Sequence, residues 1–233
     1  MTVQGTNTRI DIIFYNRERN IYLVCECKRA NPALSNWCFA RAPWPTETGF
    51  ATQSYMETIT SREDGVKFGV LGLVHSPRIF QVALEVKTDK KGNSTGSVRG
   101  EIEEAATQVA RGFNGLISFL GGERTRELVN IGETIGFIPA IFTTAKVYAT
   151  EAEVTSPDIL TGQAGKLEPS LTERDWIWYD YPQSPGLRHT IPNEHVSSNL
   201  REIVYREFIR RIAVVTPAGI PNFLGLTTWR LWR

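Results

Sequence analysis

The chain has 233 residues, of which 41% are hydrophobic and 22% are charged, and its formal net charge is +1. This composition is typical of a globular domain with a sizeable core, and it excludes a strongly basic protein that attracts nucleic acid through net charge alone, although local basic patches can still do so. No apolar run approaches the roughly 20 residues of a membrane helix, and the polar opening MTVQGTNT lacks the apolar segment of a signal peptide. Three cysteines, an odd number, do not make a disulfide framework. We therefore expect a cytoplasmic protein with no membrane partner.

Two strands are predicted near the start of the chain, over residues 9–15 and 21–29, joined by the polar turn NRERN into a β-hairpin. In the first strand Asp11 interrupts an apolar run, and in the second Glu26 and Lys28 do so. Because side chains alternate along a strand, Glu26 and Lys28 share one face. Charges inside apolar strands are costly to bury unless they are paired, bind a metal or take part in chemistry. These three residues are therefore the first candidates for a functional site.

Residues 31–80 are rich in proline and aromatic residues, which favours an ordered insertion within a single domain that spans 1–233. A short helix is expected within 48–64, and strands are expected over 66–74 and 78–89. The segment 90–100, KKGNSTGSVRG, has the composition of a flexible loop.

The clearest predicted helix covers residues 101–120, where apolar residues recur at a spacing of 3.6 and acidic residues fill the first turn. A continuous apolar run over 135–150 predicts a central strand that is covered on both faces. Residues 151–192 are loop-rich, and a helix from about Ser198 is expected to lead into a strand that ends near Val215. This alternation of elements predicts an α/β fold in which a mixed central sheet is flanked by helices.

The hairpin places Asp11 beside Glu26, since opposed residues of antiparallel strands lie about 4.5–5.5 Å apart. Two carboxylates at that distance repel one another unless a divalent cation lies between them. Oxygen ligands with open water positions suit Mg²⁺ or Mn²⁺. Lys28 projects from the same face and could stabilise negative charge on an attacked phosphoryl group. The pattern indicates metal-assisted hydrolysis.

The segments RIDIIF and VCECKRA resemble the motif of the PD-(D/E)xK nuclease superfamily, in which an acid, a hairpin turn and Glu-x-Lys follow one another. The resemblance implies a restriction endonuclease-like fold and Mg²⁺-dependent hydrolysis of DNA phosphodiester bonds. It implies that Asp11, Glu26 and the backbone carbonyl of Cys27 hold the metal, and that Lys28 positions the attacking water. Many members carry a glutamine on the following helix, and Gln108 is similarly placed; it would orient Lys28 or a phosphate.

The chain departs from that family in two respects. We expect the family's helix before the hairpin to be missing or truncated, since the chain begins only ten residues before Asp11, and either an incomplete metal site or a fragment of a longer protein would explain this. A long segment also separates Lys28 from the helix that bears the glutamine, and within it ALEVKTD repeats the pattern as Glu85 and Lys87. We prefer Glu26 and Lys28 because the hairpin supplies Asp11 as their partner. The rival pair is otherwise expected to form a solvated or paired strand face of the same sheet, away from Asp11.

Contacts to DNA phosphates are expected from cations in the glycine- and serine-rich loop and on the helix, although the loop cations also fit a solvated turn. These residues are Lys90, Lys91, Arg99 and Arg111.

Besides the leading interpretation, a nuclease that acts on DNA and can form a homodimer, two others stay open. One is a nuclease-like domain with impaired catalysis that binds nucleic acid or partner proteins. The other is an α/β scaffold whose hairpin charges form a structural ion pair.

Overall fold

The computed structural model describes twelve ranges of the chain, and the statements below concern those residues. They are 2–3, 6–7, 9–18, 21–41, 56–60, 67–71, 79–88, 94–98, 100–120, 134–153, 171–181 and 211–229.

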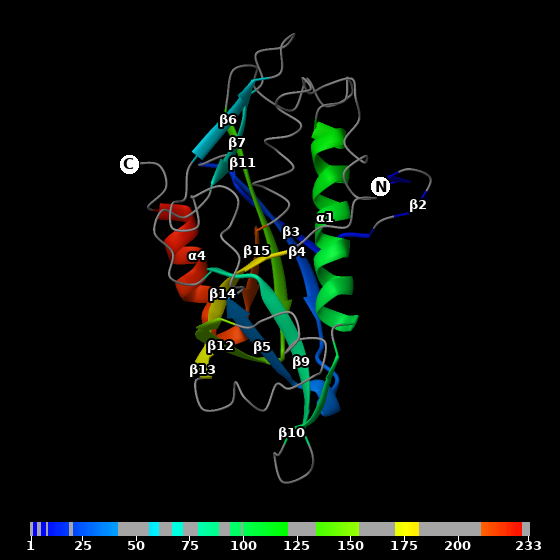
Figure 1. The fold of residues 1–233 in the computed structure, drawn as a ribbon. Coiled ribbons are helices and arrows are strands. Elements are labelled where there is room, and N and C mark those ends of the chain that lie inside the picture. Colours follow the sequence, from blue (N-terminus) through cyan, green and yellow to red (C-terminus); the bar gives the residue numbers. More distant parts are fainter. Residues whose placement is uncertain are drawn as a thin grey trace.

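Two mixed β-sheets form most of the structure (Figure 1). The larger contains, in spatial order, β3 (Ile12–Asn16), β4 (Ile21–Lys28), β11 (Thr134–Thr143), β15 (Arg211–Val215), β14 (Trp176–Asp180) and β8 (Ile79–Phe80), with β7 (Lys67–Leu71) on β11 and β6 (Met56–Thr60) on β7. The smaller contains, in order, β10 (Ser94–Val98), β9 (Val82–Thr88), β5 (Asn36–Arg41), β12 (Lys146–Glu153) and β13 (Thr172–Arg174). A separate short pair is β1 (Thr2–Val3) with β2 (Thr6–Asn7).

The helices among the described residues are α1 (Gly100–Leu120) and α4 (Ile220–Trp229), with 3₁₀ turns η1 (Pro32–Leu34) and η6 (Pro217–Gly219). The strand β15 shows where the helices lie, because its side chains alternate between two clusters. Ile212 and Val214 pack with residues of α1, whereas Ala213 and Val215 pack with Phe223 of α4. The two helices therefore cover opposite faces of the larger sheet, which confirms the predicted α/β class (Figure 1).

The two sheets are joined where strands change direction. The chain passes from β4 through η1 into β5, and from β11 through Thr144 into β12. Backbone hydrogen bonds hold this junction: the amide of Thr144 donates to Lys28 O at 3.1 Å, and the amide of Lys146 donates to Ser35 O at 2.8 Å. The single strand predicted over 135–150 is therefore two strands in two sheets. Lys28 lies at the corner where the larger sheet ends.

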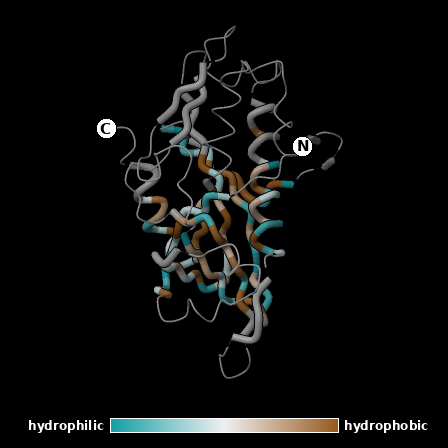
Figure 2. Tube along the Cα trace, in the orientation of Figure 1, coloured by the Kyte–Doolittle hydropathy of each residue, from teal (hydrophilic) through white to brown (hydrophobic). Residues whose placement is uncertain are grey.

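Helix α1 forms as the apolar spacing predicts, and it buries Ile102, Ala105, Ala106 and Val109 against both sheets. Its buried stripe is rich in alanine, so the helix axis can approach the strands closely. The hydrophobic positions concentrate in the strands between the helices (Figure 2). Full burial of a side chain such as that of Ile102 stabilises the fold by about 1.5–3 kcal/mol.

Three local predictions are wrong in the described residues. Part of the segment expected to form a helix is strand β6, and part of the expected loop 90–100 is strand β10. The loop-rich region contains β14, whose five side chains are all buried. A strand that is covered on both faces does not alternate polar and apolar residues, so the aromatic run WIWYD carries no period that distinguishes a strand from a loop. The expected strand that ends at Val215 is confirmed as β15, whereas the helix from about Ser198 lies outside the described residues.

The segment 31–80, expected to be an insertion, contributes strands to both sheets: β5 pairs with β9 and β12, and β7 pairs with β11. Within the described part of the chain, no helix is long and apolar enough to cross a membrane.

Candidate active site

The predicted hairpin brings Asp11 to the end of β4. Strands β3 and β4 are antiparallel, with Ile12 opposite Cys25, so that continuing this register by one residue places Asp11 opposite Glu26. The amide of Cys27 donates a hydrogen bond to Asp11 Oδ2 at 2.9 Å. This bond fixes the carboxylate of Asp11 at the point where the Glu-x-Lys segment begins.

Glu26 is buried, with 7% of its surface exposed. Burial raises the pKa of Glu26, the negative charge of Asp11 raises that pKa further, and the cation of Lys28 opposes both effects. The two carboxyl groups thus interact unfavourably when both are ionised. A positive charge near them would relieve this repulsion.

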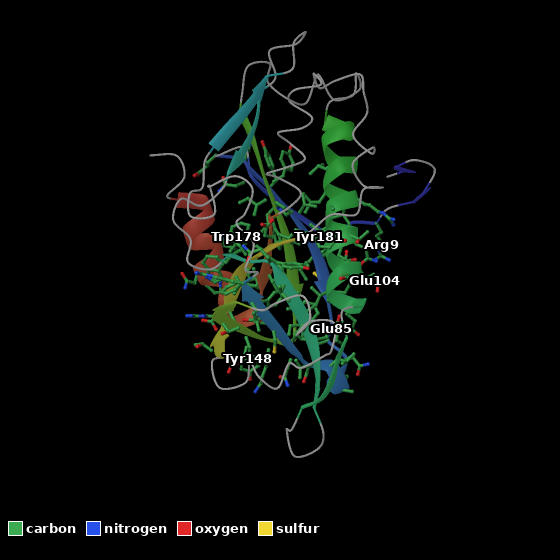
Figure 3. All side chains as sticks on the ribbon, in the orientation of Figure 1. Arg9, Glu85, Glu104, Tyr148, Trp178 and Tyr181 are labelled. Carbon is green, nitrogen blue, oxygen red and sulfur yellow. The ribbon has the colours of Figure 1, made fainter. Side chains whose placement is uncertain are left out.

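Helix α1 forms the other side of the site. Lys28 Nζ lies 3.4 Å from Glu26 Oε1 and 3.5 Å from Glu104 Oε1. Gln108, one turn further along α1, donates from Nε2 to the same Glu104 oxygen at 3.2 Å. Glu104 projects from α1, in the half of the helix that lies beside β4 (Figure 3). The helix therefore holds Lys28 through Glu104, and Gln108 acts on Lys28 through that carboxylate.

Glu104 is a site residue that the sequence alone did not identify. It lies on one polar edge of the predicted helix with Gln108 and Arg111, and the i,i+4 spacing of Glu104 and Gln108 indicates contact between those two. The sequence contains no signal that tells which strand this edge meets. Packing of α1 on β4 and β11 decides that.

Gln108 also has an oxygen that the described residues leave without a hydrogen bond. Its Oε1 is buried and lacks a partner. A buried acceptor without a donor costs about 1–3 kcal/mol. A ligand or water that donates a hydrogen bond would satisfy it.

The donor set suits a hard cation. Asp11 and Glu26 offer carboxylate oxygens, which Mg²⁺ and Mn²⁺ prefer, and burial together with the negative charge of Asp11 raises the pKa of Glu26. With the side chains placed as they are, no three His, Cys, Asp or Glu residues of the described ranges form a group that could hold a metal ion. The two carboxylates are thus of the chemical kind that such an ion prefers, without forming a complete ligand group.

The rival motif has a different environment. Strand β9 belongs to the smaller sheet, and Glu85 is fully buried. Glu85 Oε1 accepts a hydrogen bond from the amide of Ile102 at 2.9 Å, so this carboxyl caps the first turn of α1. Burial raises the pKa of Glu85, and hydrogen bonds from the helix amides oppose that shift. Glu85 and Lys87 were expected on a solvated or paired face of the sheet that contains Asp11. For Glu85 this is wrong, because Glu85 is buried in the smaller sheet and caps helix α1. The side chain of Lys87 lies outside the described residues.

The candidates for DNA contact are described only in part. Arg111 is exposed on α1, three residues after Gln108. Lys90, Lys91 and Arg99 lie outside the described residues.

Comparison with known proteins finds no matching family, no similar curated protein and no similar solved structure.

Proposed function

We propose that this chain is a metal-dependent nuclease that hydrolyses DNA phosphodiester bonds, on a restriction endonuclease-like core. One observation carries the proposal: Asp11, Glu26 and Lys28 converge at the end of β4, and α1 adds Glu104 and Gln108 beside them. Two acids and a lysine in this arrangement are the groups that phosphodiester hydrolysis with a metal requires.

In the proposed site, Asp11, Glu26 and the backbone carbonyl of Cys27 would hold Mg²⁺ or Mn²⁺. A bound cation would supply Lewis-acid stabilisation of charge on the phosphate. The amide of Cys27 already donates to Asp11, which would orient that carboxylate before any ion binds. Burial and, after it, the negative charge of Asp11 raise the pKa of Glu26, and a bound cation would offset the repulsion between the two acids.

Lys28 would position the attacking water and stabilise the negative charge that develops on the phosphate. Its ammonium group is held between Glu26 and Glu104, which restricts the rotamers of a long side chain. Gln108 would support this arrangement from one turn away, and its unpaired Oε1 could accept a hydrogen bond from the water. Lys90, Lys91, Arg99 and Arg111 would bind the DNA backbone.

A second function, a nuclease-like domain that binds nucleic acid or a partner protein without cleaving, is favoured by one feature. Lys28 already contacts two carboxylates, and the described residues offer no group of three metal-ligating side chains. A lysine neutralised in this way can be structural rather than catalytic.

A nicking assay on supercoiled plasmid tests the proposal. Wild-type protein should nick DNA with Mg²⁺ or Mn²⁺ and should stop with a chelator, whereas Asp11→Asn, Glu26→Gln and Lys28→Ala should not nick. Glu103→Gln, which removes an exposed carboxylate of α1 next to Glu104, is the matched control and should cleave normally. Calorimetry with Mn²⁺ separates the roles: Lys28→Ala should still bind the ion, because its role is in the transition state, and the acid variants should not. Protein that binds Mn²⁺ and DNA but never nicks would establish the second function instead.

A further inference from the structure

The ammonium group of Lys28 already acts as a cation beside the two acids of the candidate site. Its Nζ lies 3.4 Å from Glu26 Oε1, and both side chains are largely buried. The negative charge of Asp11 raises the pKa of Glu26, and the positive charge of Lys28 lowers it. Lys28 therefore offsets the repulsion between the acids, as a divalent ion would.

A divalent ion and this ammonium group compete for Glu26. An ion such as Mg²⁺, bonded to Glu26 Oε1 at about 2.1 Å, would lie at most about 5.5 Å from Lys28 Nζ, because the latter is 3.4 Å from the same oxygen. Two cations at this separation repel one another, and the burial of Glu26 limits screening by water. Ion binding should therefore move Lys28 away from Glu26.

Helix α1 supplies a second position for the ammonium group. Glu104 Oε1 lies 3.5 Å from Lys28 Nζ, so the group can leave Glu26 and keep this contact. Gln108 Nε2 donates to the same Glu104 oxygen at 3.2 Å, which holds that carboxylate in place although 61% of the Glu104 side chain is exposed.

Gln108 can complete this second position. Its Oε1 belongs to the same planar amide as the nitrogen bonded to Glu104, and it is buried without a hydrogen-bond partner. An ammonium group has three donors, so Lys28 can donate to Glu104 and to Gln108 together. A shift of Lys28 toward α1 would thus satisfy a buried acceptor whose isolation is costly.

We propose that Lys28 exchanges between two positions, one on Glu26 and the other on Glu104 with Gln108. A divalent ion bound by Asp11 and Glu26 shifts it to the second position. Glu104 and Gln108 are positioning residues, because they act on the ion through Lys28 and do not bind it. The exchange sets the ion concentration at which the site fills, and it rests on the proposed metal site.

The exchange needs no third metal-ligating side chain. The described residues offer no group of three such side chains, and Mg²⁺ commonly keeps several waters beside one or two carboxylates. Glu104 therefore has a role in ion binding that does not require it to reach the ion.

Calorimetry with Mn²⁺ on chelator-treated protein without DNA measures the exchange. Lys28→Met keeps the apolar stem and loses the competing charge, so it should bind Mn²⁺ about tenfold more tightly than wild-type protein. Glu104→Gln should bind Mn²⁺ about tenfold less tightly, since Lys28 then has no carboxylate besides that of Glu26. Glu103→Gln, exposed and with the same loss of charge, should change the dissociation constant by less than about threefold.

A double-mutant cycle separates positioning from metal ligation. In the Lys28→Met background, Glu104→Gln should have no larger effect than Glu103→Gln, because no lysine remains to be positioned. An undiminished effect of Glu104→Gln in that background would make Glu104 a metal ligand and overturn the inference. Lys28→Gln, which also lacks the charge, replaces Lys28→Met if circular dichroism shows that the latter does not fold.

The same titrations distinguish this inference from the nuclease proposal. Equal Mn²⁺ affinity of Lys28→Met and wild-type protein would overturn the exchange and leave the metal site intact. Failure of every variant to bind Mn²⁺ would overturn both. Binding by Lys28→Met and none by wild-type protein would support the exchange, and it would favour the domain that does not cleave.

Discussion

Lys28 Nζ lies 3.5 Å from Glu104 Oε1, although 76 residues separate the two in the chain. The contact joins the end of β4 to the first half of α1, and Gln108 donates to the same Glu104 oxygen. Removal of Glu104 should therefore release Lys28 from the helix side while its contact with Glu26 remains.

Glu104→Gln should lower the rate of DNA cleavage by about 10- to 100-fold, since a misplaced catalytic group loses that much even when it is still present. Its effect on stability should be below about 1 kcal/mol, because 61% of the Glu104 side chain is exposed and surface ion pairs contribute little. Plasmid nicking and urea unfolding measure the two effects. Glu103→Gln is the control with the same loss of charge, and equal activity of the two variants would remove Glu104 from the site.

Glu26→Gln should be more stable than wild-type protein at neutral pH in chelator. The pKa of Glu26 is raised above its ordinary value of 4.5, so the folded state holds its proton over a range in which the unfolded state has lost it. Stability of the wild type consequently falls as pH rises through that range, whereas the glutamine of the variant has no proton to lose. Melting curves from pH 4 to pH 8 should show two nearly equal proteins at the acidic end and a growing difference above it. A difference that stays constant at every pH would contradict titration of Glu26 as the cause.

Glu85→Ala should destabilise the fold by about 1–3 kcal/mol, because the buried amide of Ile102 loses its acceptor. Glu85→Gln keeps an acceptor for that amide and should be milder. Urea unfolding measures both variants. At temperatures where they are folded, both should cleave DNA at the wild-type rate; loss of cleavage in a folded Glu85→Gln protein would instead make Glu85 and Lys87 the catalytic motif.

Gly112→Ala should disturb the site through Ile10. A Cβ at position 112 would lie 2.6 Å from Ile10 Cγ1, and Ile10 directly precedes Asp11. The single variant should lose cleavage activity more than stability, since alanine favours the helix by about 1 kcal/mol relative to glycine. In a double-mutant cycle, Ile10→Ala should remove most of the effect of Gly112→Ala. Additive effects would mean that the two residues act independently.

Gly219→Ala and Gly225→Ala form a matched pair near α4. A Cβ at position 219 would collide with the backbone oxygen of Asp175, and that oxygen also accepts from Thr216, so the backbone cannot easily shift. Overpacking of this kind costs about 1–3 kcal/mol. A Cβ at position 225 meets nothing within 4 Å, and alanine there should stabilise the helix by up to about 1 kcal/mol. Thermal unfolding of both variants should therefore show shifts of opposite sign.

The hairpin, helix α1 and the common face of Glu26 and Lys28 could all be predicted from the sequence. Each of these depends on residues close together in the chain, through side-chain alternation in a strand and the 3.6-residue period of a helix. The position of Asp11 opposite Glu26 follows from one turn and is local in the same sense. Predictions at this range need no knowledge of how distant elements pack.

Which distant elements meet became clear only in the folded chain. The apolar run over 135–150 is divided between β11 and β12, WIWYD is a buried strand, and β9 lies in the second sheet. Two glutamates of similar appearance also have different environments: Glu104 contacts Lys28, while Glu85 caps α1. The physical reason is that each role depends on burial and on a partner far away in the chain. These are set by the packing of α1 against the two sheets, which no local period encodes.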